Sequence, residues 1–472
     1  MILNVFEEKP IRNTLLPVEW QSQASLDELA SFLQHNWEQR YAFYDDKQIS
    51  SKQQVLSFIG QKGIKPNSYI GTIVFKGHRL NIFPKMFQAY RDENDPSHLD
   101  EKHLLKNIVQ WIEYCTKIDY PYINITSELD DAEDLKELFI TLYVRYVKSA
   151  LDRGLFYQYE DQTEECTTIK GKVDYRDYFT RKYYSEKQNR FLCTFSNFEF
   201  DNNLNRIIKF VCRKLLSDTS TLANKKMLRH ILMKLNEVSD IRCAPHDCDK
   251  IRLTRFHRHY KIVLSMSKMF LLNQTSTYAV DDTESFCFLF PTEVLYEGFV
   301  GGFLQSILED TAKVTLQASD TSLIEDIVID DTSYGSAFTL RNDIYVQMEH
   351  GRCFVLDTKY KQVDRIENSK ASAAAIQRQI SIDDLRQIRE YAHRRGLKEG
   401  YLLYPVYRFE DLDHPPKVLL KGYIVVDGEK HYIDVYIIRV PFVFEDDAER
   451  TKKMLSGILS EIFVEKSINN NA

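Results

Sequence analysis

The chain has 472 residues, 43% of them hydrophobic, which is enough to bury a large core and to form two or three domains. Its formal net charge of −7 excludes a protein that coats nucleic acid through bulk electrostatics, so any affinity for phosphates must come from local patches or from a partner. Eight scattered cysteines, an acidic start without a secretory signal, and no apolar run of membrane-spanning length indicate a cytoplasmic protein with reduced thiols and no membrane contact.

The first zone, residues 1–155, is expected to mix strands and helices. A strand pair is centred on a turn at Lys76 and Gly77. Helical spacing of apolar residues predicts three helices, over residues 25–37, 103–118 and 132–152. We therefore expect an N-terminal mixed β/α domain.

The middle zone, residues 156–275, is expected to be mostly helical after Asn203, with amphipathic stretches over 204–216 and 227–238. Two features leave alternatives open. The first is a group of cysteines and histidines, which could bind zinc or could belong to a loop that precedes a basic helix. The group comprises Cys243, His246, Cys248, His257 and His259. The second is a pair of basic runs, which could contact a phosphate backbone or be faces exposed to solvent. One run includes Arg252, Arg255, Arg258 and Lys261, and the other spans Arg181 to Tyr184.

The last zone holds the most informative pattern. Residues 338–347 alternate as a strand does, with Asp343 on the face opposite the apolar residues. After a turn, residues 353–360 form a second expected strand, on which Asp357 and Lys359 point the same way because strand side chains repeat every two residues. If the strands pair as a hairpin with Asp343 on that face, two carboxylates and one ammonium converge at the end of a sheet.

Those groups suit a magnesium-dependent phosphodiester hydrolase. Mg²⁺ prefers carboxylate oxygens and keeps several waters, so Asp343, Asp357 and a scissile phosphate can complete its coordination shell. The metal polarises the phosphoryl oxygen and acidifies a bound water, while Lys359 can orient that water and offset charge in the transition state. The same pattern also occurs at an ordinary solvated sheet edge, where lysine blocks edge pairing, and that alternative stays open.

Two helices flank the hairpin and carry further candidates. One begins at Glu293 and could bring Glu297 to the same cleft as a further acidic ligand. The other is expected over residues 381–393, where Gln387 and Tyr391 lie four apart on one face. Each of these three candidates could equally be a surface or boundary residue. Two strands around an Asp-Gly turn and a closing helix complete the zone, over residues 419–426, 431–440 and 449–464.

The order of these features resembles the McrC family. The resemblance rests on a Glu-bearing helix, Asp343, the run from Asp357 to Lys361, the Gln387-x-x-x-Tyr391 helix, and Leu402-Leu403-Tyr404-Pro405. Similar stretches precede these, namely Tyr69-Ile70-Gly71, residues 80–85, Arg153-Gly154-Leu155, residues 170–174 and residues 198–206. The similarity runs from about residue 69 to 405.

McrC is the nuclease subunit of McrBC-type modification-dependent restriction systems and belongs to the PD-(D/E)xK superfamily. The resemblance implies an α+β or α/β chain with an N-terminal domain over 1–155, a helical middle region over 156–275, and a PD-(D/E)xK-type endonuclease domain over 276–472, with a central mixed sheet flanked by helices. It implies Mg²⁺ or Mn²⁺ as the cofactor. The implied metal ligands are Asp343, Asp357 and Glu297, and the further catalytic residues are Lys359, Gln387 and Tyr391.

The resemblance also implies partners, namely a McrB-like AAA+ GTPase, on which residues 1–155 would dock, and double-stranded DNA, with methylated DNA as one candidate. The chain has no Gly-x-x-x-x-Gly-Lys-Ser/Thr run, so it is not expected to bind a nucleotide itself. Two other hypotheses stay open. One is a non-catalytic activator of the GTPase ring with a degenerate nuclease domain, and the other is a zinc-stabilised DNA-binding protein.

Two details of the motif bear on these alternatives. Asn342 stands where the superfamily has proline before the first aspartate, which favours the activator hypothesis slightly. Lys361 lies on the same face as Lys359 and could replace it, although the Asp-x-Lys spacing favours Lys359.

Overall fold

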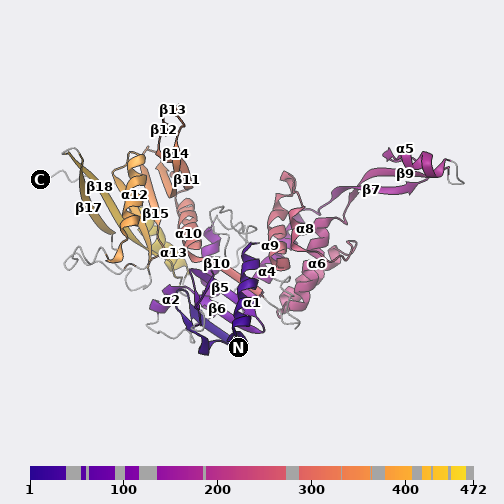
Figure 1. Ribbon diagram of the computed structural model, residues 1–472, viewed down its shortest axis with the longest axis horizontal. Helices are drawn as coiled ribbons and strands as arrows, with labels where there is room; N and C mark the ends of the chain where they lie inside the picture. Colours follow the sequence, from indigo (N-terminus) through magenta and orange to yellow (C-terminus); the bar gives the residue numbers. More distant parts are fainter. Residues whose placement is uncertain are drawn as a thin grey trace. The chain divides into compact units, whose positions relative to one another are not determined.

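A computed structural model describes residues 1–38, 55–59, 63–90, 101–115, 135–183, 188–272, 286–330, 332–361, 363, 378–406, 417–426, 429–444 and 448–463. The chain divides into two compact units (Figure 1). The first comprises Met1–Glu38, Tyr44–Leu129 and Phe286–Ala472, and the second comprises Gln39–Phe43 and Asp130–Ser285. The expected architecture of helices packed against mixed sheets is confirmed. The expected boundaries near residues 155 and 275 stay a prediction.

The N-terminal part of the first unit is built on a four-stranded sheet in the order β1-β6-β5-β10. Its strands are β1 (Ile2–Phe6), β5 (Tyr69–Phe75), β6 (His78–Phe83) and β10 (Phe286–Pro291). β5 and β6 are the expected strand pair. β10, which follows the second unit in the sequence, pairs with β5. A smaller sheet and helix α1 (Gln23–Glu38) share the core of this part; the sheet contains β2 (Ile11–Arg12), β4 (Gly63–Pro66) and β3 (Leu56–Phe58).

Helix α10 (Thr292–Ile307) packs closely against helix α3 (Glu101–Tyr114), and glycines allow the approach. A Cβ atom at Gly302 would lie 1.6 Å from the carbonyl oxygen of Tyr114, and one at Gly298 would lie 2.2 Å from the sulfur of Cys115. Glycine lowers helix stability by about 1 kcal/mol relative to alanine, so its repeated use here reflects packing. Helix α2 (Lys85–Tyr90) follows β6 directly.

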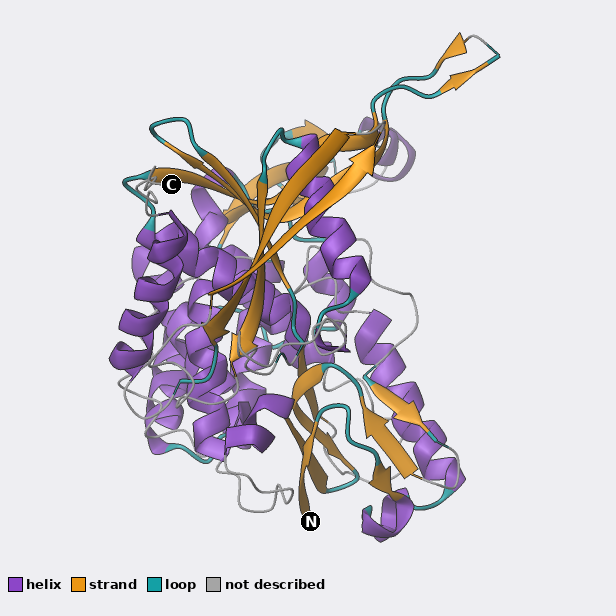
Figure 2. Ribbon diagram, turned by 90° about the vertical axis from the view of Figure 1, so that its left-hand side faces the viewer, coloured by secondary structure: helices purple, strands orange, loops and turns teal. Residues whose placement is uncertain are grey.

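A six-stranded sheet forms the C-terminal part of the first unit, in the order β11-β14-β15-β16-β18-β17. Its strands are β11 (Ala312–Ile324), β14 (Ala337–Met348), β15 (Cys353–Thr358), β16 (Glu399–Val406), β17 (Lys417–Val426) and β18 (Glu429–Pro441). The central β15, β16 and β18 are parallel and the outer pairs are antiparallel. The strands are visibly twisted in Figure 2, as expected for L-amino acids.

Helices cover both faces of this sheet. Helix α12 (Ile382–Arg394) packs on the face that bears Val355, and helix α13 (Ala448–Phe463) packs on the other, where Phe463 meets Phe354 edge to face. The expected turn at residues 427–428 lies outside the described residues, although the strands that it joins are paired. A short hairpin of β12 (Val328–Ile329) and β13 (Thr332–Ser333) lies between β11 and β14.

The second unit is a helical body from which a β-arm extends (Figure 1). The body contains α4 (Leu135–Arg153), α6 (Asn203–Asp218), α7 (Leu222–Lys234), α8 (Pro245–Asp249), η8 (Arg255–Tyr260) and α9 (Lys261–Leu272). The arm contains β7 (Gln158–Cys166), β8 (Lys172–Val173), α5 (Tyr175–Asp177), η7 (Tyr178–Lys182) and β9 (Phe191–Glu199).

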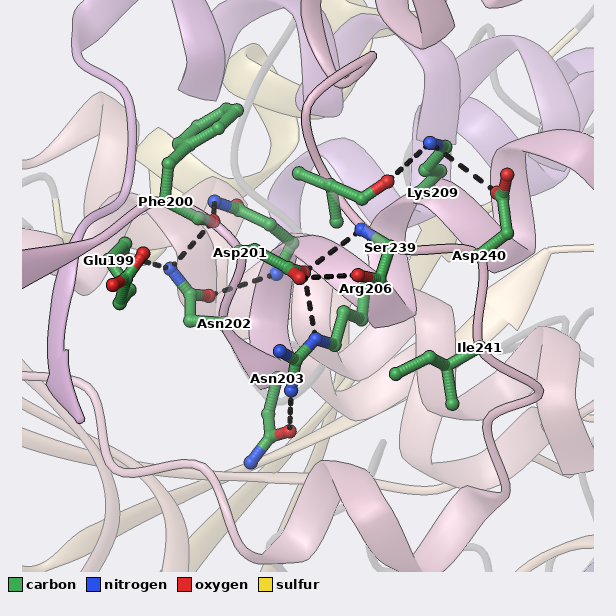
Figure 3. A network of polar contacts seen from close by, with 12 residues as sticks. Glu199, Phe200, Asp201, Asn202, Asn203, Arg206, Lys209, Ser239, Asp240 and Ile241 are labelled. Atoms are coloured by element: carbon green, nitrogen blue, oxygen red, sulfur yellow. Dashed lines mark hydrogen bonds and ion pairs between the residues drawn. The ribbon is translucent and has the colours of Figure 1, made fainter. Parts of the chain in front are cut away.

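A polar network fixes the base of this arm to the helical body (Figure 3). The amide nitrogens of Asn202 and Asn205 donate hydrogen bonds to the carbonyl oxygens of Phe156 and Phe200, which lie at the roots of the two long strands. Asn202 also caps α6 by accepting from the backbone N–H of Asn205. The two asparagines therefore join both roots of the arm to the first turn of one helix.

Candidate active site

The predicted hairpin forms and brings the two aspartates together. β14 and β15 pair antiparallel with Ile344 opposite Leu356, so one further step of the same register brings Asp343 opposite Asp357. Opposed residues in an antiparallel pair lie on the same face of the sheet, with Cβ atoms about 5 Å apart. The turn between the strands is closed by Gly351, which has a φ of 87°. Both aspartates thus face the side of the sheet that α12 covers.

A chain of contacts joins the remaining candidates to Asp357. The ammonium of Lys359 lies 2.5 Å from Asp357 Oδ2 and donates to Gln387 Oε1 at 3.0 Å. Gln387 in turn donates to the hydroxyl of Tyr391 at 2.7 Å. Gln387 and Tyr391 lie one helical turn apart on α12, whose first turn is capped by the hydroxyl of Ser381. The structure therefore places four of the predicted site residues in one connected group.

Asp343 is held in place by the strand that carries the second aspartate. Its Oδ2 accepts hydrogen bonds from the backbone N–H and from the hydroxyl of Thr358, both at 2.9 Å. Thr358 lies between Asp357 and Lys359 in the sequence. The same short segment therefore orients all three charged groups.

Burial and like charge make Asp357 hard to ionise. Its side chain is 1% exposed. Burial, together with the negative charges of Asp343 and Asp384, raises the pKa of Asp357 to about 7, although Lys359 partly opposes this. Burial alone would lower the pKa of Lys359, but the three aspartates outweigh it and raise that pKa. The site holds more negative charge than one lysine neutralises, and a cation would relieve that excess.

The donor set fits a hard divalent cation. Neither oxygen of Asp357 accepts a hydrogen bond of normal geometry from a described residue, although its Oδ2 lies 2.5 Å from the nitrogen of Lys359. A buried carboxylate without hydrogen-bond donors is costly unless another partner satisfies it. Because carboxylate oxygens are the ligands that Mg²⁺ and Mn²⁺ prefer, Asp343 and Asp357 are suited to hold such an ion.

Glu297 is the predicted metal ligand that the structure does not place in a metal-binding cluster with the two aspartates. It is half-buried on α10, a helix that contacts β14 and β15. Within the part of the chain that the structure describes, no three Asp, Glu, His or Cys side chains lie close enough to hold one metal ion. Glu297 therefore does not form a three-ligand cluster with Asp343 and Asp357 in this structure, and no zinc cluster forms around Cys243, His246 and Cys248.

A third aspartate, which was not predicted as a site residue, lies near the site. Asp384 is buried on α12 and accepts two hydrogen bonds from the ammonium of Lys361, at 2.9 and 2.8 Å, and one from the hydroxyl of Tyr404, at 3.2 Å. Asp384, Gln387 and Tyr391 follow the spacing i, i+3, i+7 that marks one helix face. That spacing could have identified Asp384.

Asn342, at the position where the resemblance led us to expect proline, has a local structural role. Asn342 is buried in β14, opposite Ala318 of β11, and its side-chain oxygen accepts a hydrogen bond of 2.6 Å from Arg395. Arg395 also pairs with Asp320 and lies 3.9 Å from the ring centre of Tyr345. A proline could not accept this bond. Asn342 therefore contributes to fixing β14 against the residue that follows α12.

The substitution Asp357→Asn is expected to stabilise the protein, and to do so more at pH 8 than at pH 5. The pKa of Asp357 is ordinarily 3.8 and is about 7 in the folded protein. At pH values between these two, the folded state keeps a proton that the unfolded chain has lost, so this aspartate destabilises the fold progressively as pH rises. Asparagine removes that effect. We expect the free energy of unfolding to rise by about 1–2 kcal/mol at pH 8, a gain that is limited because Lys359 loses its charged partner. Urea unfolding at both pH values measures the difference.

The matched control is Asp383→Asn, which removes an acid that is 82% exposed from the first turn of α12. It should change stability by no more than a few tenths of a kcal/mol at either pH. A gain for Asp357→Asn that is the same at pH 5 and pH 8 would contradict the expectation.

Known proteins resemble this chain in sequence profile and in fold. The profile of a family described as McrBC 5-methylcytosine restriction system component matches residues 64–405. One similar solved structure is the refined half-complex from a tetradecameric assembly of Thermococcus gammatolerans McrB AAA+ hexamers with bound McrC. The matching chain in it is 17% identical to the present chain, and the match has a TM-score of 0.61 and covers 98% of the present chain and 100% of the matching one. A chain of the Thermococcus gammatolerans McrBC complex is 16% identical, with a TM-score of 0.45 over 65% of this chain and 88% of that one. No curated protein sequence matches. Among the described residues, no helix is both long and apolar enough to span a membrane.

Proposed function

Because the chain belongs to the family of McrBC 5-methylcytosine restriction system components, we propose that it is the Mg²⁺-dependent DNA endonuclease subunit of such a system. In this proposal the six-stranded sheet with its flanking helices is a PD-(D/E)xK-type nuclease domain. It cleaves phosphodiester bonds of double-stranded DNA when it is assembled with a GTP-hydrolysing AAA+ partner. The observation that carries the proposal is the connected group of Asp357, Lys359, Gln387 and Tyr391 opposite Asp343.

In this proposal Asp343 and Asp357 hold the metal ion, with Mn²⁺ as a substitute for Mg²⁺. When bound, the ion supplies Lewis acidity toward the scissile phosphate and lowers the pKa of water. Thr358 holds Asp343 by two hydrogen bonds, and Asp357 is buried with the ammonium of Lys359 beside its Oδ2. The residues thus present carboxylate oxygens in a fixed position, which is the contribution that a protein makes to such a site.

The proposed role of Lys359 is to orient the attacking water and to offset negative charge in the transition state. Its ammonium is kept protonated by the three aspartates and is aimed by Gln387, so little reorganisation is needed during the reaction. Tyr391 accepts from Gln387 and fixes that amide in turn. In this proposal Gln387 and Tyr391 also position the DNA strand. Glu297 is proposed only as a further ligand that would have to move toward the aspartates.

The similar chain of known structure comes from an assembly that contains McrB AAA+ hexamers, and this supports a motor of the same kind as the partner. We propose that residues 1–155 dock on that motor. The partner would supply GTP hydrolysis, because the sequence of this chain contains no phosphate-binding loop of the Gly-x-x-x-x-Gly-Lys-Ser/Thr type.

Reconstitution with a McrB-like AAA+ GTPase tests the proposal. Double-stranded DNA with and without 5-methylcytosine is incubated with both proteins, GTP and Mg²⁺. We expect cleavage that stops when EDTA removes the metal and that resumes when excess Mg²⁺ is added. Stimulation of GTP hydrolysis without cleavage of any substrate, in Mg²⁺ or Mn²⁺, would favour the alternative of a non-catalytic activator.

A further inference from the structure

A buried glutamate near the start of the chain contacts the segment directly after β15, which carries the proposed catalytic lysine. Glu7 follows β1 and its side chain is 1% exposed. Its carboxylate accepts three hydrogen bonds: from the backbone N–H of Lys85 at 3.0 Å, from the hydroxyl of Thr292 at 2.8 Å, and from the hydroxyl of Tyr360 at 2.7 Å. The donors belong to three segments that are distant in the sequence, so this carboxylate is the point at which they meet.

Tyr360 is the residue directly after Lys359, and it contacts Glu7 whereas Lys359 contacts Asp357. Its ring is 5% exposed, lies 6.0 Å from those of Tyr296 and Phe442, and has the ammonium of Lys85 4.9 Å from its centre. The backbone turns at Tyr360, because the N–H of Lys361 donates to the carbonyl oxygen of Lys359 at 2.8 Å, so fixing the ring of Tyr360 also fixes the backbone that carries Lys359. The backbone N–H of Lys359 is also bound, to the carbonyl oxygen of Leu403 at 2.9 Å.

We infer that Glu7 is a positioning residue for the proposed nuclease site, and that it acts by holding Tyr360 and thereby the backbone that aims Lys359 at Asp357. The inference rests on the proposed function. It assigns to the first strand of the chain a role in a site that lies about 350 residues later in the sequence.

The alternative is that Glu7 only stabilises the fold. Burial raises the pKa of Glu7 to about 7, and the three hydrogen bonds oppose that rise without cancelling it. A buried carboxylate of this kind costs stability, and a group kept only for packing could be apolar instead. Three donors aimed at one carboxylate from three segments favour a role in geometry.

A double-mutant cycle on the cleavage rate separates the two roles. Glu7→Gln and Tyr360→Phe are prepared singly and together, each in the full chain assembled with its AAA+ partner. We expect each single variant to slow DNA cleavage about tenfold, the effect of losing one hydrogen bond to a charged group. If Glu7 acts through Tyr360, the double variant is no slower than the slower single one. GTP hydrolysis by the partner is unchanged in all three variants, because both side chains are buried and so do not themselves touch the motor.

A second measurement does not depend on activity. Amide hydrogen exchange of the free protein is followed in the peptide that covers residues 354–361. We expect faster exchange there in Glu7→Gln and in Tyr360→Phe. The matched control is Tyr401→Phe, which removes a buried tyrosine hydroxyl that donates to Glu399 at 2.8 Å on the neighbouring strand. This variant should leave exchange in the peptide and the cleavage rate unchanged.

The outcomes distinguish failure of the inference from failure of the proposed function. Cleavage by the wild-type protein that is insensitive to Glu7→Gln and Tyr360→Phe, or slowed by them multiplicatively, overturns the inference alone. A tenfold loss in Tyr401→Phe also overturns it, because the effect would then be general. If the wild-type assembly never cleaves DNA, the inference and the proposed function both fail.

Discussion

Replacement of Asp357 by asparagine is expected to reduce the rate of DNA cleavage by about a factor of 10³, which corresponds to about 4 kcal/mol of transition-state stabilisation. Asparagine keeps the size of the side chain but loses the charge that would hold the metal ion and pair with Lys359. The measurement is the single-turnover cleavage rate in saturating Mg²⁺ with the AAA+ partner present. GTP hydrolysis by the partner should persist.

Two properties of this variant make the result easy to interpret. We expect Asp357→Asn to be more stable than the wild-type protein at pH 8, so a loss of cleavage cannot be attributed to unfolding. Asp383→Asn, on the exposed side of the first turn of α12, should cleave at the wild-type rate. Persistent Mg²⁺-dependent cleavage by Asp357→Asn would remove this aspartate from the proposed site.

The substitution Lys359→Met is expected to slow cleavage by about a factor of 10², because methionine keeps much of the length and the apolar stem but cannot offset charge in the transition state. Lys361→Met is the matched control. Lys361 lies two residues further on and is 49% exposed, and its ammonium binds Asp384, whereas that of Lys359 binds Asp357 and Gln387. Single-turnover rates of the two variants, measured side by side, decide between the lysines.

We expect Lys361→Met to slow cleavage no more than threefold, because Lys361 is half-exposed and its ammonium binds Asp384 and not Asp357. The reverse order, with Lys361→Met inactive and Lys359→Met active, would transfer the role to Lys361. Loss of activity in both variants would instead indicate that the Asp384 pair takes part in the site.

The local part of the site could be predicted from the sequence because it follows from the period of a strand. Alternation over residues 338–347 and 353–360 placed Asp343 on one face of its strand and Asp357 with Lys359 on one face of the next. The turn between them then brought the two strands together as a hairpin. The spacing of Gln387 and Tyr391 likewise predicted a shared helix face, and the structure has them in contact.

The contacts that depend on distant segments could not be predicted in the same way. Periodicity tells which face a residue occupies but not which remote segment packs there. No local pattern connects Glu7 with Tyr360, Asn342 with Arg395, or β10 with β5. Helix boundaries were also less exact, since the stretch expected over 227–238 begins at Leu222 and ends at Lys234 in α7.

The pairing of β5 with β10 has a consequence for how the protein is made. The second unit lies between these strands in the chain, so a ribosome must synthesise all of it before Phe286–Pro291 emerges to complete the N-terminal sheet. We expect the inserted unit to fold first during synthesis, while β1, β5 and β6 wait with one sheet edge unpaired. A truncated chain that ends at residue 285 should therefore show a protease-resistant second unit beside a protease-sensitive N-terminal segment.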